Sequence, residues 1–428
     1  MNIENKNINE IKPYPKNAKQ HPKKQVDKIA NSISKFGFNQ PIVLDKDNVI
    51  IVGHGRYFAA QTLGMEEVPT ITVELSDEDA TAYRLADNKL NESDWDMELV
   101  IEDLKTLSLE KVDLTGFDSN LVLETEEDDQ IDIRVNPDPE TVLGDIYELG
   151  KHKIICGDAT KQEDYDKLLG DEKARLIFTD PPYSVDYVSQ TGKSYESEEY
   201  GGSGGRIFND DKNPEEALKF YTESLKRLYD NTSNDVTIYW WYANSLFPTN
   251  LQSFNDTGWR YSQTCFWLKE HFVFSFGQLY HRVYEPCMVG WKKGKTHFVN
   301  GIFSNLTEFW SLYTKKTRDY VNDHIDLWFE KRDTISKYIH PTQKPVRLAE
   351  RALKRSSEEE DIVLDTFGGS GSTMIACEQL NRKTRMMELD PKYVDAIVSR
   401  WCQFKENPEI IKNGEKIVWS HYEKPKKK

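Results

Sequence analysis

The chain carries two successive patterns of apolar and polar positions. In the first 123 residues, the spacing of Val26, Ile29, Ile33 and Phe36 is typical of an amphipathic helix. Short apolar runs bounded by turn residues follow it and predict strands. This part is therefore expected to be a small α/β domain. Its helices are expected at 25–36, 57–63, 77–90 and 97–109, and its strands at 41–44, 49–52 and 68–75.

A larger α/β pattern begins at residue 144. Apolar runs of strand length alternate with helical segments, which predicts an open, mostly parallel sheet. Between the two patterns, residues 124–140 are acidic and then contain Pro137 and Pro139, which indicates a linker. Strands are expected in a hairpin at 147–156 and at 174–178, 236–242, 265–269, 284–291, 361–365 and 384–390, and helices at 162–169, 217–228, 346–354 and 372–380.

Length and composition agree with a protein of several domains. With 428 residues, of which 38% are hydrophobic, two or three domains with real cores are expected. No apolar stretch approaches the roughly 18 residues of a membrane span, and the N-terminus has no apolar signal region. Five scattered cysteines without a CxxC pair favour a reducing cytoplasm and argue against zinc or disulfides. The net charge of -16 argues against indiscriminate coating of nucleic acid but allows a local basic groove.

The motif Asp180-Pro181-Pro182-Tyr183 follows the strand expected at 174–178. The prolines end the strand because they have no N–H to donate, and ligands bind at this edge of α/β sheets. Asp180 and the Pro181 carbonyl could accept hydrogen bonds from an amine on a heteroaromatic ring, and Tyr183 could stack on that ring. The plainer alternative is an ordinary strand exit with a surface tyrosine.

A second motif lies near the C-terminus. A buried strand at 361–365 is followed by the glycine-rich turn 366–371, a helix and another strand that contains Glu388. This is the arrangement of nucleotide-binding βαβ units, in which an acid about 20 residues after the glycines meets ribose hydroxyls. A dinucleotide site is the alternative, but Met374 stands where its third glycine would be.

Together the two motifs resemble those of the β group of DNA amino methyltransferases, which use S-adenosylmethionine. Asp-Pro-Pro-Tyr comes first, a basic region rich in aromatic residues comes second, and Asp-x-Phe-x-Gly-x-Gly comes last. The resemblance covers nearly all of 144–405. It implies a Rossmann-like, mostly parallel seven-stranded sheet in a methyltransferase domain at 141–428, with a target-recognition region at about 188–337.

The resemblance also implies roles for single residues. The segment from His340 to Pro345 resembles one that lies beside the methionine part of the cofactor, where Lys344 could meet the carboxylate; a solvated lysine is the alternative. No metal is implied. The catalytic residues would be Asp180, Pro181, Pro182 and Tyr183, and the cofactor-binding residues Asp158, Lys344, Asp365, Phe367, Gly369, Gly371, Ser372 and Glu388.

The function implied is methyl transfer from S-adenosylmethionine to the N6 amine of adenine, since Asp in the first motif position is the usual adenine form. The base would be flipped out of double-stranded DNA. The alternatives are an N4-cytosine methyltransferase, or a DNA-binding regulatory protein with a vestigial methyltransferase fold. A homodimer and a place in bacterial or phage restriction-modification would also agree with the resemblance.

In the N-terminal domain, Gly53-His54-Gly55-Arg56 forms a glycine-rich turn before a helix. Such a turn can present amides to an anion, with Arg56 reinforcing it, although a plain tight turn is the alternative. The pattern resembles the ParB/sulfiredoxin-like fold over about 70 residues. The absence of a cysteine before Cys156 argues against reductase activity, and a single arginine stands where ParB has a pair.

Overall fold

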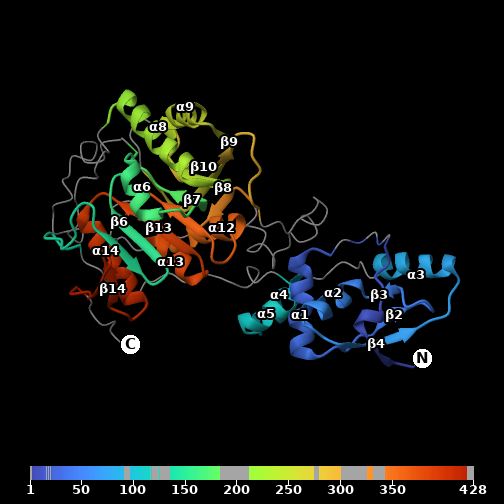
Figure 1. Cartoon of the computed structure of the whole chain (residues 1–428). Helices are drawn as coiled ribbons and strands as arrows, with labels where there is room; N and C mark the ends of the chain where they lie inside the picture. Colours follow the sequence, from blue (N-terminus) through green and yellow to red (C-terminus); the bar gives the residue numbers. More distant parts are fainter. Residues whose placement is uncertain are drawn as a thin grey trace. The chain divides into compact units, whose positions relative to one another are not determined.

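The computed structural model describes residues 2–15, 17, 19, 21–90, 97–115, 117, 125, 135–183, 212–273, 279–299, 325–330 and 343–421. The chain divides into two compact units, Met1–Leu123 and Glu124–Lys428 (Figure 1). Much of the expected target-recognition region, and residues 340–342 of the segment before Lys344, lie outside the described residues. No described helix combines the length and apolar content that crossing a membrane requires.

The first unit contains a four-stranded mixed sheet in the order β1-β4-β2-β3. Buried apolar residues of the strands and of α2, among them Ile42, Leu44, Ile50 and Tyr57, form its core. The elements are β1 (Glu4–Asn7), a 3-10 turn (Ile8–Glu10), α1 (Lys23–Phe36), β2 (Ile42–Leu44), β3 (Ile50–Val52), α2 (His54–Thr62), β4 (Glu67–Thr72), α3 (Asp77–Leu90), α4 (Met97–Lys105) and α5 (Leu109–Thr115).

Two helix boundaries in this unit differ from the expectation. The segment expected as one helix at 97–109 forms two, because the chain turns at Thr106, whose hydroxyl donates to the Asp103 carbonyl at 2.6 Å. Such side-chain to backbone bonds compete with helix continuation. The helix expected from Tyr57 begins at His54, so the glycine-rich turn is part of its first turn.

The second unit is built on an eleven-stranded sheet in the order β11-β9-β10-β8-β7-β12-β13-β6-β5-β14-β15. Its central strands β8, β7, β12, β13 and β6 are all parallel, which confirms the mostly parallel centre. The strands are β5 (Ile146–Leu149), β6 (His152–Cys156), β7 (Ala174–Thr179), β8 (Thr232–Trp241), β9 (Trp259–Val273), β10 (Arg282–Lys292), β11 (Leu327–Phe329), β12 (Ile362–Asp365), β13 (Lys383–Glu388), β14 (Glu409–Lys412) and β15 (Glu415–Val418).

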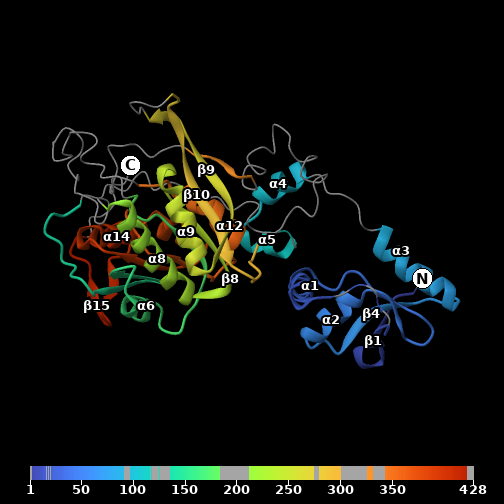
Figure 2. The same cartoon turned by 90° about the horizontal axis from the view of Figure 1, so that it is seen from above.

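The sheet is wider than the seven strands expected, because further strands extend it on both sides. On one side β10 pairs antiparallel with β8 and with the long strand β9, which Figure 2 shows beside it. On the other side β5 pairs with β14 of the C-terminal hairpin. This hairpin was not predicted from the sequence.

Helices cover both faces of the sheet, and the strand residues alternate between them. Ile155 and Met387 pack with α6, α8 and α9, whereas their neighbours Ile154 and Met386 pack with α13 and α14. The α12 helix contacts α13 and β7. The helices are α6 (Gln162–Leu169), α8 (Pro214–Asp230), a 3-10 turn (Asn244–Leu246), α9 (Phe247–Thr257), α12 (Val346–Ser356), α13 (Ser372–Gln379) and α14 (Pro391–Phe404).

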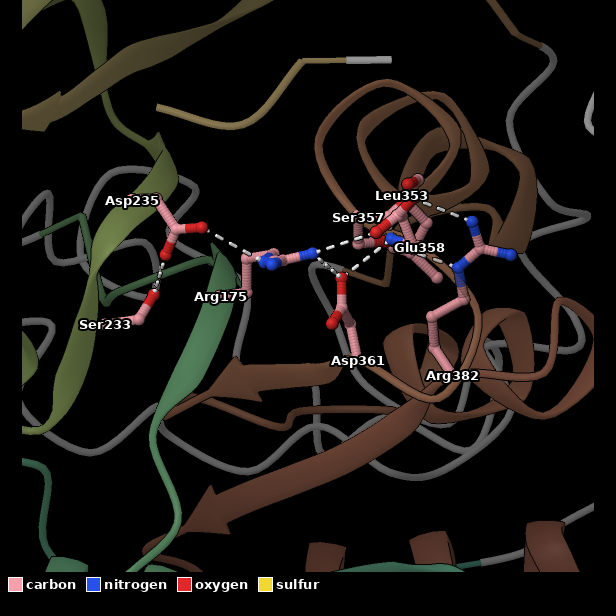
Figure 3. Close-up of polar contacts among 8 residues, drawn as sticks. All are labelled: Arg175, Ser233, Asp235, Leu353, Ser357, Glu358, Asp361 and Arg382. Atoms are coloured by element: carbon pink, nitrogen blue, oxygen red, sulfur yellow. Dashed lines mark hydrogen bonds and ion pairs between the residues drawn. The ribbon is translucent and has the colours of Figure 1, made fainter. Parts of the chain in front are cut away.

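A polar network joins the amino ends of the central strands (Figure 3). Arg175 on β7 binds Asp361 before β12 at 3.0 Å, Glu358 at 3.3 Å and Asp235 on β8 at 3.3 Å. Beside it, Arg382 donates to the Ser357 carbonyl at 3.0 Å. These contacts tie three strands together at one edge and leave the opposite edge for ligands.

Candidate active site

The carboxyl ends of β6, β13, β12 and β7 lie at one edge of the sheet. Glu388 on β13 is level with Cys156 on β6, and Leu364 on β12 is level with Ile177 on β7. The Gly157 N–H donates to the Glu388 carbonyl at 2.9 Å, so the pairing continues to the edge. This edge therefore brings together four of the five segments in which the sequence predicts catalytic and cofactor-binding residues, and Lys344 lies in the fifth.

Asp180, directly after β7, forms an ion pair with Lys344. The two side chains are 21% and 8% exposed, so Lys344 is buried and not solvated. Its Nζ also donates to the Tyr183 hydroxyl at 3.4 Å and lies 3.6 Å from Oε2 of Glu285. Burial works against the ammonium, but the carboxylates of Asp180 and Glu285 outweigh it and raise the pKa of Lys344 above its ordinary value. Lys344 therefore stays charged.

The second oxygen of Asp180 is free for a ligand. Oδ1 is buried and accepts no hydrogen bond from any residue in the described part of the chain. After the buried Pro181, the Pro182 carbonyl accepts a hydrogen bond from the Tyr221 hydroxyl at 2.7 Å, which fixes the path of the motif. Burial raises the pKa of Tyr183 well above its ordinary value, so its hydroxyl stays protonated.

Asp365 and Phe367 hold the loop that follows β12. Asp365 Oδ1 accepts hydrogen bonds from the Thr179 hydroxyl at 2.8 Å and from the Phe367 N–H at 3.2 Å, which joins the ends of β12 and β7. Burial raises the pKa of Asp365 to about 7. The partly buried Phe367 ring lies 5.9 Å from that of Phe220 and 6.2 Å from that of Trp240.

Glu388 ends β13 and faces the glycine loop. Its Oε2 accepts a hydrogen bond from the Gly369 N–H at 2.8 Å, and its Oε1 accepts one from the Asp390 N–H at 2.9 Å. Burial raises the pKa of Glu388 to about 7. Each carboxylate oxygen has a second lone pair, so Glu388 can still accept hydrogen bonds from the hydroxyls of a ligand.

The glycine loop packs closely against its surroundings. A Cβ atom on Gly368 would lie 2.9 Å from Sδ of Met386, and Gly371 has a φ of +81° where α13 begins. A side chain at either position would be strained. Ser372 donates to the Lys344 carbonyl at 2.7 Å, so the loop also holds the segment that carries Lys344.

Asp158 follows β6 at the same edge. Its Oδ1 accepts hydrogen bonds from the N–H and hydroxyl of Thr160 at 2.9 and 2.8 Å, and its N–H donates to Asp164 at 2.9 Å. These bonds shape the turn into α6. The structure thus gathers all the residues predicted for catalysis and cofactor binding at one edge, while their contacts with ligands stay predictions.

In the first unit, the predicted anion-binding turn is tightly packed. Gly53 has a φ of +104°, and a Cβ atom on Gly55 would lie 2.9 Å from Ile29 on α1. His54 is buried and its Nε2 accepts a hydrogen bond from the Tyr14 N–H at 3.1 Å.

The two polar side chains of this turn already have protein partners. Arg56 donates to the Gln40 carbonyl at 2.8 Å. Burial, together with His21 and Arg84, lowers the pKa of His54 to about 4, so His54 is neutral at pH 7. If this turn binds an anion, the contact must come from its backbone amides or from a movement of Arg56.

Three residues at this edge of the sheet were not predicted from the sequence. Glu285 on β10 pairs with Lys269 on β9 and lies near Lys344, and the Trp241 ring lies 4.9 Å from the Lys344 ammonium. None of them stands in a motif. Only the pairing of β8, β9 and β10 places them here, so the sequence offered no signal for them.

Comparison with known families decides what kind of protein carries this site. Residues 174–399 match the DNA methylase family, which covers the N6 and N4 types. The chain belongs to the DNA methylase family. Residues 1–89 match the ParB N-terminal domain, so this DNA methylase carries a ParB-like domain in front, which confirms the predicted fusion.

Single proteins match one or the other of these two parts. The methylase is 24% identical over 288 residues to the type II methyltransferase M.HinfI of Haemophilus influenzae, covering 60% of this chain and 70% of that one. It is 42% identical over 72 residues to the ParB-like nuclease domain-containing protein YnaK of Escherichia coli K12, covering 17% and 83%. The solved M1.HpyAVI-SAM complex shares 20% identity, with a TM-score of 0.41, over 58% of this chain and 97% of that one.

Proposed function

We propose that this DNA methylase transfers a methyl group from S-adenosylmethionine to the N6 amine of adenine in double-stranded DNA. The observation that carries the proposal is the buried Oδ1 of Asp180, which has no donor among the described residues. A buried acceptor without a partner costs free energy, so this oxygen favours a ligand that brings a hydrogen-bond donor. An exocyclic amine brings two.

The residues around Asp180 agree with a flipped base as that ligand. Tyr183 can stack on a heteroaromatic ring, and the Pro181 carbonyl can accept the second amine hydrogen. Hydrogen bonds from the amine to these acceptors favour a localised lone pair on nitrogen, which makes the amine a better nucleophile. Asp180 can then take the proton that the methylated amine gives up.

The loop edge fits S-adenosylmethionine. Glu388 has spare acceptor capacity for ribose hydroxyls, and glycines at 369 and 371 are the residue type that lets a cofactor approach the backbone of such a loop. Phe367 offers an aromatic face beside them, and Asp158 lies at the end of the neighbouring strand. When bound, S-adenosylmethionine supplies an electrophilic methyl group.

We also propose a division of labour within the chain. All the residues proposed for the reaction lie in 141–428, so residues 1–123 are not needed for methyl transfer and instead affect how the enzyme engages DNA. Residues from Glu124 onward belong to the methylase unit and not to a separate linker.

The test is a nucleoside analysis. Unmethylated genomic DNA is incubated with the full chain and methyl-labelled S-adenosylmethionine, digested, and analysed by mass spectrometry. Labelled N6-methyladenine is the expected product. Labelled N4-methylcytosine would reassign the target base, and a folded protein that binds the cofactor but labels no base would overturn the proposed function.

A further inference from the structure

Four charged side chains of alternating sign form a row beside the proposed amine site. Lys269 pairs with Glu285, Glu285 lies 3.6 Å from the ammonium of Lys344, and Lys344 pairs with Asp180. The exposed fractions of the two lysines are 5% and 8%, so both are nearly buried. Buried charges of this kind persist where each has an opposite partner, and the row supplies one for each.

Strand register explains why the row exists. Thr179, the last residue of β7, is level with Trp240 on β8, and the next β8 residue, Trp241, is level with Cys287 on β10. Asp180 therefore comes level with the end of β8. Glu285 stands on β10 two residues beyond Cys287 and therefore lies past the last residue of β8. No residue of β8 separates Glu285 from the end of β7. The Lys344 ammonium bridges this gap over the Trp241 ring.

The row reaches Asp180 through one of its oxygens only. Lys344 takes Oδ2, which leaves Oδ1 without a donor among the described residues. From these contacts we propose that Lys344, held in place by Glu285 and Lys269, favours the ionised form of Asp180 and fixes its orientation, so that Oδ1 is the oxygen that meets the target amine. Burial raises the pKa of Asp180 above its ordinary value, and the Lys344 ammonium and the Tyr183 hydroxyl oppose that shift. This inference rests on the proposed function. Glu285 and Lys269 are then positioning residues that act through Lys344.

Other groups face Asp180, and they must be separated from the row. Tyr183 on the same segment and Cys287 on β10 are neutral, since burial raises the pKa of each well above its ordinary value. Asp365 at the end of β12 also interacts with Asp180, and its own pKa is raised to about 7 by burial. The pH profile of Asp365→Asn alone therefore shows which part of the wild-type profile belongs to Asp365.

The experiment measures the single-turnover methylation rate against pH at saturating S-adenosylmethionine. Lys344→Met removes the cation, so the acid limb of the profile should move to higher pH by about one unit or more. Glu285→Gln keeps a polar side chain of the same size beside Lys344 but removes a negative charge that opposes the ionisation of Asp180, so the limb should move the opposite way. Glu330→Gln is the matched control, because Glu330 pairs with Arg351 on α12 and lies outside the row. The proposal is overturned if the acid limbs of the Lys344→Met and Glu285→Gln profiles stay where the wild-type limb lies, or if both move in the same direction.

A second readout does not depend on methylation. Asp180→Asn and Lys344→Met should be non-additive in the urea midpoint of unfolding, since each removes the partner of the other. Additive effects contradict the row. Non-additive effects without any methylation leave the row intact and overturn the proposed function alone.

Calorimetry tests whether Lys344 instead binds the cofactor. The affinity of Lys344→Met for S-adenosylmethionine should lie within about twofold of that of the wild type, and a large loss of affinity would assign Lys344 to the cofactor carboxylate.

Discussion

Thr125 donates both its N–H, at 2.7 Å, and its hydroxyl, at 2.5 Å, to the same oxygen of Glu350 on α12. Both residues are buried, and Arg347 on the same helix donates to the Thr125 carbonyl at 3.2 Å. The segment expected as a linker is therefore anchored to the methylase unit at one of its first residues. The α12 helix begins two residues after Lys344, so this anchor reaches close to the site.

We expect the anchor to decide where the N-terminal domain can be removed. A chain that begins at Glu124 should keep the stability of the methylase unit. A chain that begins at Pro139 should lose about 1–3 kcal/mol of unfolding free energy, because Glu350 loses both donors from Thr125. Both chains should bind S-adenosylmethionine and methylate DNA, with altered salt dependence of DNA binding.

Urea unfolding and methylation assays check these expectations. Thr125→Val in the full chain is the control for the loss of the hydroxyl alone. A folded Glu124 chain that binds the cofactor but methylates no DNA would contradict the division drawn between the domains.

Asp180→Ala should reduce methylation about 100-fold or more, because it removes the acceptor that orients the target amine. Affinity for S-adenosylmethionine should change only a few-fold, since Asp180 lies at the amine site and not at the ribose. Calorimetry and a methylation assay check the two parts. Substantial turnover by the variant would show that the amine is held elsewhere.

The affinity for S-adenosylmethionine should rise with pH. The pKa of Glu388 is about 7, and ribose hydroxyls donate to its ionised form. At pH 6 only roughly one-tenth of Glu388 is ionised, so binding should be about tenfold weaker than at pH 8. Calorimetry at several pH values checks this slope.

Two variants assign that pH dependence to one carboxyl group. Glu388→Gln should bind about 1–3 kcal/mol more weakly at pH 8 and lose the slope. Asp365→Asn should keep the slope, although the pKa of Asp365 is also about 7. A slope that follows Asp365 and not Glu388 would mean that the ribose lies elsewhere.

The N-terminal unit should be acid-labile because of His54. Its pKa is lowered from 6.5 to about 4, so between these values the unfolded chain binds a proton that the folded chain does not. Stability is therefore lost as pH falls from about 6.5 towards 4, by at most about 2 kcal/mol at pH 5. Hydrogen exchange of peptides from 42–72 checks this, and His54→Asn should flatten the dependence. Equal protection at pH 5 and pH 7.5 in the wild-type chain would refute it.

The sequence predicted well which residues lie at the ligand-binding edge of the sheet, because its motifs lie at the ends of strands. A buried run followed by Pro181 or by Gly369 marks a place where a strand stops, and parallel strands stop at the same edge. The placement of Asp180 and Glu388 at one edge needed nothing more.

The rest depends on contacts that no local pattern encodes. Glu285 faces Lys344 only because β10 runs past the end of β8, and the register of an antiparallel strand follows from packing along its whole length. Thr125 stands in an acidic stretch typical of a linker, yet a single buried acceptor on a helix over 200 residues later holds it. The hydrogen-bond partners of His54 and Arg56 could not be predicted from the sequence either, since a glycine-rich turn has the same sequence pattern whether it binds a ligand or packs against its own domain.

The pairing of β7 with β12 has a consequence for the nascent chain during translation. Leu176 is level with Val363, so one side of the central strand has no neighbour until about 190 more residues have left the ribosome. At roughly 5–20 residues per second this takes about 10–40 s, during which an apolar strand edge is open to other chains. We therefore expect the growing chain to depend on chaperones in that interval, and its yield to rise when holdase chaperones are in excess.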